Sequence, residues 1–221
     1  YKPAHVDFIR SYKPVHVPSE ATIEEAARLI NNSVKPFALV GQGVELGEAR
    51  EELKALLEKA QIPAGCTMLG LSALPTDHPL NMGMLGMHGN LGPNVMTNQC
   101  DLLIAIGMRF DDRVTGKLET YAKQARIIHF DIDPSEINKN VKVDVAVVGN
   151  CKQTLQRVTE LVEPARHQAW VDGFKPYEDK EDYKVIQPAI HPTEGPLLMG
   201  EVVRAVSEAT AHKAILVTDV G

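Results

Sequence analysis

Four charged residues stand close together in one short stretch of the sequence, GMRFDDRVTG (107–116), directly after a continuous apolar run. Arg109 and Arg113 each offer a fork of N–H donors that matches a phosphate or a carboxylate. Asp111 and Asp112 can hold these forks in place. A solvated turn of self-paired charges is the alternative interpretation. Charges at the end of a buried strand cost most where they lack a partner, so we favour an anionic ligand.

Three further motifs could contact a ligand. The turn GQGVELG (41–47) resembles a glycine turn that presents backbone N–H groups to a phosphate, although it does not match GxGxxG. Met87 and His88 stand between glycines in LGMHG, and glycine allows the backbone to approach a ligand closely. Asp131 follows a predicted strand, where an acid can bind ribose hydroxyls. The alternatives are a plain tight turn, a surface or core histidine, and a turn before a proline.

The elements that would position these motifs alternate between strand and helix. Apolar runs predict strands within residues 37–43, 62–67, 101–107, 125–133 and 141–149. Helical spacing of apolar residues predicts helices that include residues 23–30, 47–60, 92–99 and 151–162, and a long loop is expected from Met68 to Leu91. This pattern predicts an α/β fold, a doubly wound (Rossmann-like) six-stranded parallel sheet with helices on both faces. Ligands bind outside the carboxyl ends of such strands, where the charged motifs would meet.

Composition argues against several classes of function. The 221-residue chain has a net charge of −6 and no basic run, which disfavours nucleic acid and anionic membranes as partners. Its apolar runs are shorter than the ~20 residues of a membrane helix. The three cysteines lie far apart, which fits a reducing cytoplasm and buried free thiols. The motifs GxSxG, HExxH, GxxxxGK[ST] and CxxC are absent, so no complete catalytic apparatus or metal site is predicted.

The domain organisation follows from composition. Residues 1–18 are rich in proline and are predicted to be a linker, and residues 19–163 contain the strand–helix pattern. Residues 164–198 are polar and are predicted to be a second linker, on which Trp170, Phe174 and Tyr177 could pack a short helix onto the surface. Residues 199–221 predict a helix and then a strand at 214–221. We expect the chain to be a piece of a longer protein.

Three motifs, LGMHG, DLLIAIGMRFDDRVTGK and IIHFDIDPSEINKN, occur in the order and at the spacing that resemble the large catalytic subunit of acetohydroxyacid synthase (acetolactate synthase). The resemblance implies that residues 19–163 are the central FAD-binding domain of a thiamine-diphosphate-dependent enzyme, and that residues 199–221 begin its thiamine-diphosphate-binding domain. The acid that activates thiamine would precede Tyr1, and the metal-binding motif would follow Gly221. The chain alone would therefore contain no catalytic residue and be inactive.

The resemblance also implies an activity and partners for the full-length enzyme. It would condense two pyruvates, or pyruvate and 2-ketobutyrate, with loss of CO2 in branched-chain amino-acid biosynthesis. It would use thiamine diphosphate and Mg²⁺, and act in the cytoplasm as a homodimer or tetramer with a regulatory small subunit. Two alternatives remain open at this point: the central domain of a thiamine-dependent decarboxylase or ligase without FAD, and a free-standing nucleotide-binding module.

Matching positions imply the residues of the site. A structural FAD, without a redox role in the main reaction, would contact Gly43, Thr67, Met68, Gly86, Met87, His88, Arg109, Asp111, Arg113, Asp131, Ile132, Gly149 and Asn150. The substrate channel would be lined by Met87, Asp112 and Arg113, and Arg113 could pair with a ketoacid carboxylate. This sequence departs from the family pattern twice: GQG replaces GGG in the first turn, and asparagine replaces aspartate at position 150.

Overall fold

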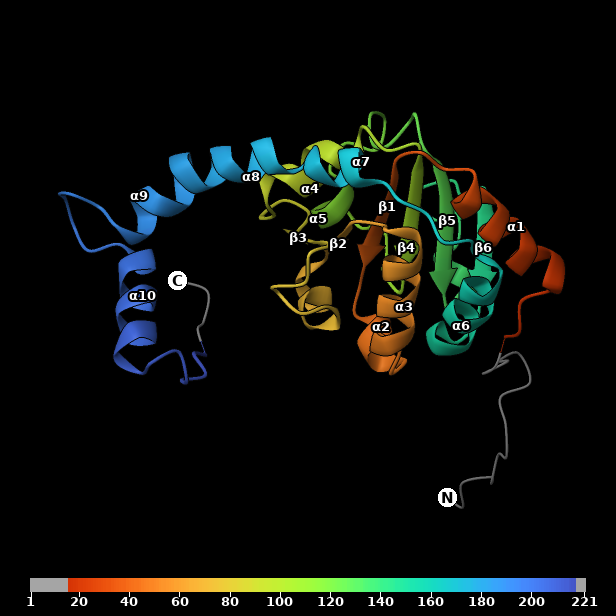
Figure 1. Ribbon diagram of the computed structural model, residues 1–221, viewed down its shortest axis with the longest axis horizontal. Helices are drawn as coiled ribbons and strands as arrows, with labels where there is room; N and C mark the ends of the chain where they lie inside the picture. Colours follow the sequence, from red (N-terminus) through yellow and green to blue (C-terminus); the bar gives the residue numbers. More distant parts are fainter. Residues whose placement is uncertain (1–15, 218–221) are drawn as a thin grey trace, which may run out of the picture. The chain divides into compact units, whose positions relative to one another are not determined.

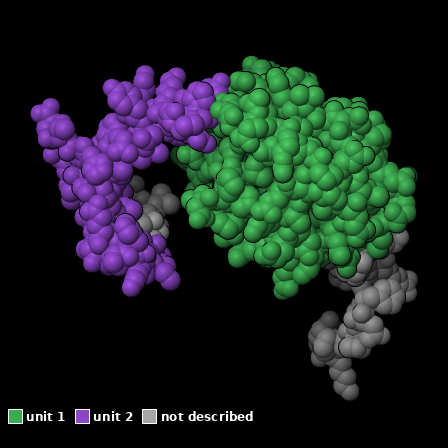
Figure 2. Space-filling view, in the orientation of Figure 1, with its two compact units in different colours: residues 1–174 green, residues 175–221 purple. Residues whose placement is uncertain are grey.

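The computed structural model describes residues 16–217 of the chain. The chain divides into two compact units, residues 1–174 and residues 175–221 (Figure 2). The first unit contains all the strands of the described residues, and the second contains helices and irregular backbone.

The first unit is built on one sheet of six parallel strands, in the order β3-β2-β1-β4-β5-β6 (Figure 1). The strands are β1 (Pro36–Val40), β2 (Ala64–Cys66), β3 (Asn81–Met84), β4 (Leu102–Ile106), β5 (Arg126–Asp131) and β6 (Val145–Val148). Every residue of β1 and β4 is buried, as their continuous apolar runs predict for central parallel strands. The predicted α/β fold is therefore confirmed.

One strand lies where the sequence predicts only a long loop. β3 has the sequence NMGM, which contains none of the β-branched or aromatic residues that are typical of strands. It pairs with β2, and Met84 N also donates to Asn90 Oδ1 at 2.8 Å. The pairing with β2 thus overrides the low strand propensity of the segment.

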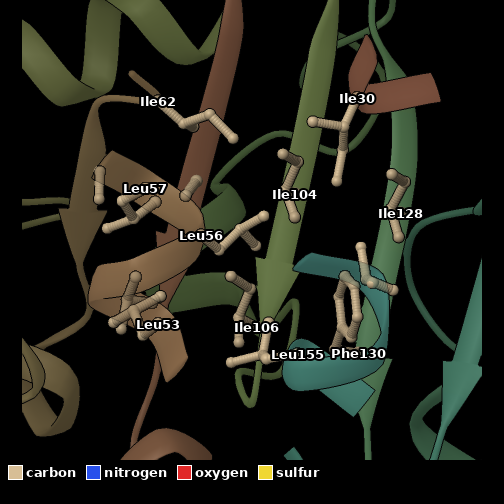
Figure 3. Close-up of a cluster of buried hydrophobic side chains, with 14 of the residues drawn as sticks. Ile30, Leu53, Leu56, Leu57, Ile62, Ile104, Ile106, Ile128, Phe130 and Leu155 are labelled. Atoms are coloured by element: carbon tan, nitrogen blue, oxygen red, sulfur yellow. The ribbon is translucent and has the colours of Figure 1, made fainter. Parts of the chain in front are cut away.

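Helices cover both faces of the sheet. α1 (Glu20–Asn31), α3 (Arg50–Ala60) and α6 (Cys151–Leu161) lie over one face, with the short α2 (Gly43–Leu46) below them (Figure 1). α4 (Leu91–Thr97) and α5 (Asp112–Thr115) belong to the other side, and α7 (Gln168–Asp172) lies at the end of the sheet where β1 begins. The main core lies under the first group and includes side chains from five elements: Ile30, Leu53, Leu56, Leu57, Ile104, Ile106, Ile128, Phe130 and Leu155 (Figure 3).

The first unit continues past residue 163 to Phe174. Trp170 and Phe174 are buried, at 8% and 1% exposure, whereas Tyr177 is only partly buried. Trp170 Nε1 donates to the carbonyl of Pro36 at 2.8 Å, and the ring of Phe174 lies 5.3 Å from that of Phe37. α7 is therefore packed against the beginning of the central strand β1.

The described part of the second unit, residues 175–217, contains four helical segments: α8 (Lys175–Glu181), a π-helical turn (Asp182–Ile186), α9 (Gln187–Ile190) and α10 (Met199–Ala209). α10 agrees with the helix that the sequence predicts there. The strand predicted at 214–221 is not formed by residues 214–217, and the rest of it lies outside the described residues. A strand needs a neighbour for its backbone hydrogen bonds, and the described residues of this unit offer none. The predicted domain limits stay predictions.

Candidate functional site

The ligand-binding position of this fold lies between β1 and β4. These strands are neighbours in the sheet, but the chain leaves β1 toward β2 on one side and β4 toward β5 on the other. A crevice opens where such connections diverge, outside the carboxyl ends of the strands. A cavity of about 420 Å³ lies at this position, within the usual range of ligand pockets, roughly 300–1,000 Å³.

Most of the residues that the sequence predicts to contact a cofactor line this cavity. Ten of the thirteen are present: Gly43, Thr67, Met68, Arg109, Asp111, Arg113, Asp131, Ile132, Gly149 and Asn150. They lie at the carboxyl ends of β1, β2, β4, β5 and β6 or in the segments that directly follow these strands. The rule that parallel strands place their carboxyl ends at one edge thus accounts for their assembly.

Glycines bring two of these loops into direct contact. Gly43 N donates to the carbonyl of Gly107 at 2.8 Å. A Cβ added at Gly43 would lie 2.6 Å from Gly107 Cα, and one at Gly41 would lie 2.3 Å from the Gly107 carbonyl oxygen. Gly107 also has φ +57°, which other residues rarely adopt. Bare backbone therefore forms this wall of the cavity.

The two arginines of the charged loop are not paired with its two aspartates. Arg109 and Arg113 are exposed, and neither guanidinium forms an ion pair within the part of the chain that the structure describes. Asp111 instead caps α5, because its Oδ1 accepts from Arg113 N at 3.1 Å. The prediction that Asp111 and Asp112 hold the guanidinium forks is wrong, since the start of a helix uses the first carboxylate.

Two side chains that sequence reasoning missed hold the backbone of the charged loop, residues 107–116, in place. His129 Nε2 donates to the carbonyl of Met108 at 2.8 Å, and Asn140 Nδ2 donates to the carbonyl of Phe110 at 2.7 Å. His129 is fully buried, and the ring of Phe110 meets its ring edge-on at 5.1 Å. The sequence does contain a signal for His129, since a histidine within the otherwise apolar strand IIHF indicates a buried polar group that needs a hydrogen-bond partner.

The far end of the cavity is formed by β5, β6 and the start of α6. Asp131 Oδ1 accepts from Asp133 N at 2.8 Å, which shapes the turn after β5. Asn150 caps α6, because its Oδ1 accepts from Lys152 N at 3.0 Å. Burial raises the pKa of the neighbouring Cys151 thiol to about 12, and the negative charges of Asp131 and Glu52 add to this effect. This thiol is therefore neutral near neutral pH.

The remaining predicted residues lie elsewhere. Gly86, Met87 and Asp112 line a neighbouring cavity of about 360 Å³, which shares Arg113 with the first. The exposed His88 lines neither of these cavities. LGMHG follows β3, two strands away from β1, which explains the separation. The two loops still touch, because Met87 N donates to the carbonyl of Arg113 at 2.8 Å.

Two other features of the described residues bear on function. Within residues 16–217, no three histidine, cysteine, aspartate or glutamate side chains are grouped so that they could hold a metal ion. In the same range, the helices are too short or too polar to cross a membrane.

Comparison with known proteins agrees with this architecture. Residues 23–158 match the family model described as "Thiamine pyrophosphate enzyme, central domain". The chain is 42% identical to the acetolactate synthase large subunit of Parasynechococcus marenigrum, over 92% of this chain and 33% of that protein. It is 48% identical to the probable acetolactate synthase large subunit of Methanocaldococcus jannaschii, over 70% and 26%.

A third relative gives the same result. The isozyme 2 large subunit of acetolactate synthase from Escherichia coli is 38% identical, over 91% of this chain and 35% of the relative. The chain thus spans about a third of the length of these curated relatives, or less. The resemblance to acetolactate synthase large subunits is confirmed, and this chain belongs to the family of thiamine pyrophosphate enzymes, whose central domain it contains.

Proposed function

We propose that this chain is the central, FAD-binding part of an acetolactate synthase large subunit. The full-length protein would condense two pyruvates, or pyruvate and 2-ketobutyrate, with loss of CO2 in branched-chain amino-acid biosynthesis. The observation that carries the proposal is the cavity between β1 and β4, which combines a wall of glycine backbone with two arginines that have no ion-pair partner in the described residues.

The donor set of this cavity fits the parts of FAD. Arg109 and Arg113 would pair with its diphosphate, since a guanidinium matches phosphate oxygens in a bidentate manner. Asp131 would accept hydrogen bonds from ribose hydroxyls. The apolar side chains of Met68 and Ile132, which are 65% and 58% exposed, would cover the rings. The bound flavin is expected to be structural, and it would not transfer electrons in the main reaction.

The neighbouring cavity would form part of the substrate channel. It contains Met87, Asp112 and Arg113, and the guanidinium of Arg113 would steer a ketoacid carboxylate. Because Arg113 borders both cavities, it would contact FAD on one side and the channel on the other. Thiamine diphosphate and Mg²⁺ would be bound by other parts of the full-length subunit.

The proposal extends to assembly and location. The full-length subunits would form a homodimer or tetramer and bind a regulatory small subunit. A cytoplasmic location is supported by the three cysteines, which are all free and buried, because disulfides are rare in that compartment.

The direct test is a titration of the flavin-free full-length protein with FAD, followed by flavin fluorescence. Arg109→Ala should weaken the Kd about 10- to 100-fold, which is the usual loss when a charged hydrogen-bond partner is removed. Arg166→Ala is the matched control, because Arg166 is also exposed but lies outside both cavities. It should leave the Kd unchanged.

Two results would contradict the proposal. If the full-length protein does not bind FAD saturably, the chain comes from a thiamine-dependent relative that lacks flavin. If Arg109→Ala binds FAD as tightly as Arg166→Ala does, the flavin is held at another position.

A further inference from the structure

The loop that carries Arg109 alternates between buried and exposed side chains. Met108 and Phe110 are 3% and 4% exposed, and Arg109 between them points out of the core. The backbone on either side of Arg109 is therefore fixed inside the protein. The direction of its guanidinium depends on what holds that backbone.

Two side-chain donors hold it, one on each side of the arginine. His129 Nε2 reaches the carbonyl of Met108 at 2.8 Å, and Asn140 Nδ2 reaches the carbonyl of Phe110 at 2.7 Å. The ring of Phe110 is enclosed by two aromatic neighbours, with His129 at 5.1 Å and Tyr121 at 6.2 Å. The carbonyls of the two residues that flank one exposed arginine are thus anchored from within the core.

His129 also lies beside a second residue of the cavity. Its Nε2 is 3.6 Å from Asp131 Oδ2, too far for a hydrogen bond but close enough for the N–H dipole to act on the carboxylate. Nε2 must carry a proton, because a carbonyl only accepts. His129 Nδ1 has no partner among the described residues, although the side chain is fully buried. A buried acceptor without a donor lowers stability, and an apolar side chain here would avoid that cost.

We propose that His129 is a positioning residue of the cavity. Its single N–H fixes the carbonyl of Met108, and with it the backbone that carries Arg109, and it lies next to Asp131 at the end of the same strand. The proposal rests on the proposed function for the identity of the ligand, an FAD with its diphosphate at Arg109. The hydrogen bond from His129 to the carbonyl of Met108 does not depend on a bound ligand.

Two amide variants separate positioning from packing. In His129→Gln the amide nitrogen replaces Nε2 at nearly the same distance along the side chain, so the bond to Met108 can form. His129→Asn carries the same amide one methylene shorter, and it cannot reach. Ile127→Val is the packing control, because it removes one carbon and opens a small space at a buried position on the same face of β5 without touching a hydrogen bond of the loop.

Two quantities are measured on the full-length protein. The first is the Kd for FAD by flavin fluorescence. The second is the hydrogen exchange of the backbone amides of residues 107–113 in the flavin-free protein. We expect His129→Asn to weaken the Kd and to speed exchange, each about tenfold, as for the loss of one buried hydrogen bond. His129→Gln and Ile127→Val should stay close to the wild type in both.

The outcomes distinguish this proposal from the proposed function. Equal effects of the Gln and Asn variants would overturn it, as would wild-type behaviour of His129→Asn or an equal effect of Ile127→Val. If the wild type itself does not bind FAD, the proposed function fails. Hydrogen exchange then decides on His129 alone: faster exchange only in His129→Asn supports positioning, and unchanged exchange refutes it.

Discussion

Removal of the Trp170 side chain should destabilise the first unit strongly, although this residue lies beyond the last strand and the last helix of the main core. The side chain is 8% exposed, contacts the ring of Phe174 at 5.6 Å, and donates a hydrogen bond to Pro36. Truncation of a buried tryptophan to alanine usually costs about 3–5 kcal/mol. A typical domain has only about 5–15 kcal/mol of stability, so Trp170→Ala should remove a large share of it.

Urea denaturation and thermal melting of the chain, both followed by circular dichroism, measure this loss. The expected fall in the melting temperature is roughly 6–20 °C, from about 2–4 °C per kcal/mol for a chain of this size. Phe174→Ala should cost a similar amount, but the two losses should not add, because the rings touch. Tyr183→Ala is the control, since Tyr183 is 77% exposed. If Trp170→Ala and Tyr183→Ala differ by less than about 0.5 kcal/mol, α7 does not belong to the folded unit.

Three further predictions concern individual positions. Gly107→Ala should destabilise more than Gly116→Ala by thermal melting: both glycines have φ near +57°, but a Cβ at Gly107 would lie 2.6 Å from backbone, whereas one at Gly116 meets nothing within 4 Å. Asn150→Ala should cost about 1 kcal/mol in urea because α6 loses its cap, whereas Asn150→Asp should not destabilise, since a negative charge is favourable there. Burial raises the thiol pKa of Cys66 to about 11 and that of Cys151 to about 12. Because these folded-state pKa values exceed the unfolded value, the free energy of unfolding should keep its full value below about pH 8.5 and fall as the pH rises from there toward 12. A free energy of unfolding that does not change over this range would show that the thiols are not desolvated.

Much of the sheet could be predicted from the sequence because its central strands carry continuous apolar runs. β1 and β4 are buried on both faces, and only such runs satisfy that environment. β3 could not be predicted in this way, because the short segment Asn81–Met84 gains its strand conformation from pairing with β2. The α7 contacts were also beyond local patterns, since Trp170 and Pro36 are 134 residues apart.

The candidate site was predictable to the extent that topology determines it. Parallel strands bring their carboxyl ends together, so residues as distant as Gly43 and Asn150 could be expected at one cavity. Strand order also explains why Met87 lies in a different cavity, but the sequence does not give that order. The partners of individual side chains were not predictable. Asp111 could pair with an arginine or cap α5, and only the local backbone decides between them.

The packing of α7 on β1 has a consequence for synthesis of the protein. The chain is made from its N-terminus, so Phe37 is synthesised 137 residues before Phe174, the residue whose ring packs against it. At about 5–20 residues per second, part of the central strand stays uncovered for on the order of ten seconds after it is made. During this time the nascent chain exposes an apolar surface to other chains and to chaperones. Slow translation or truncation before α7 should therefore favour aggregation.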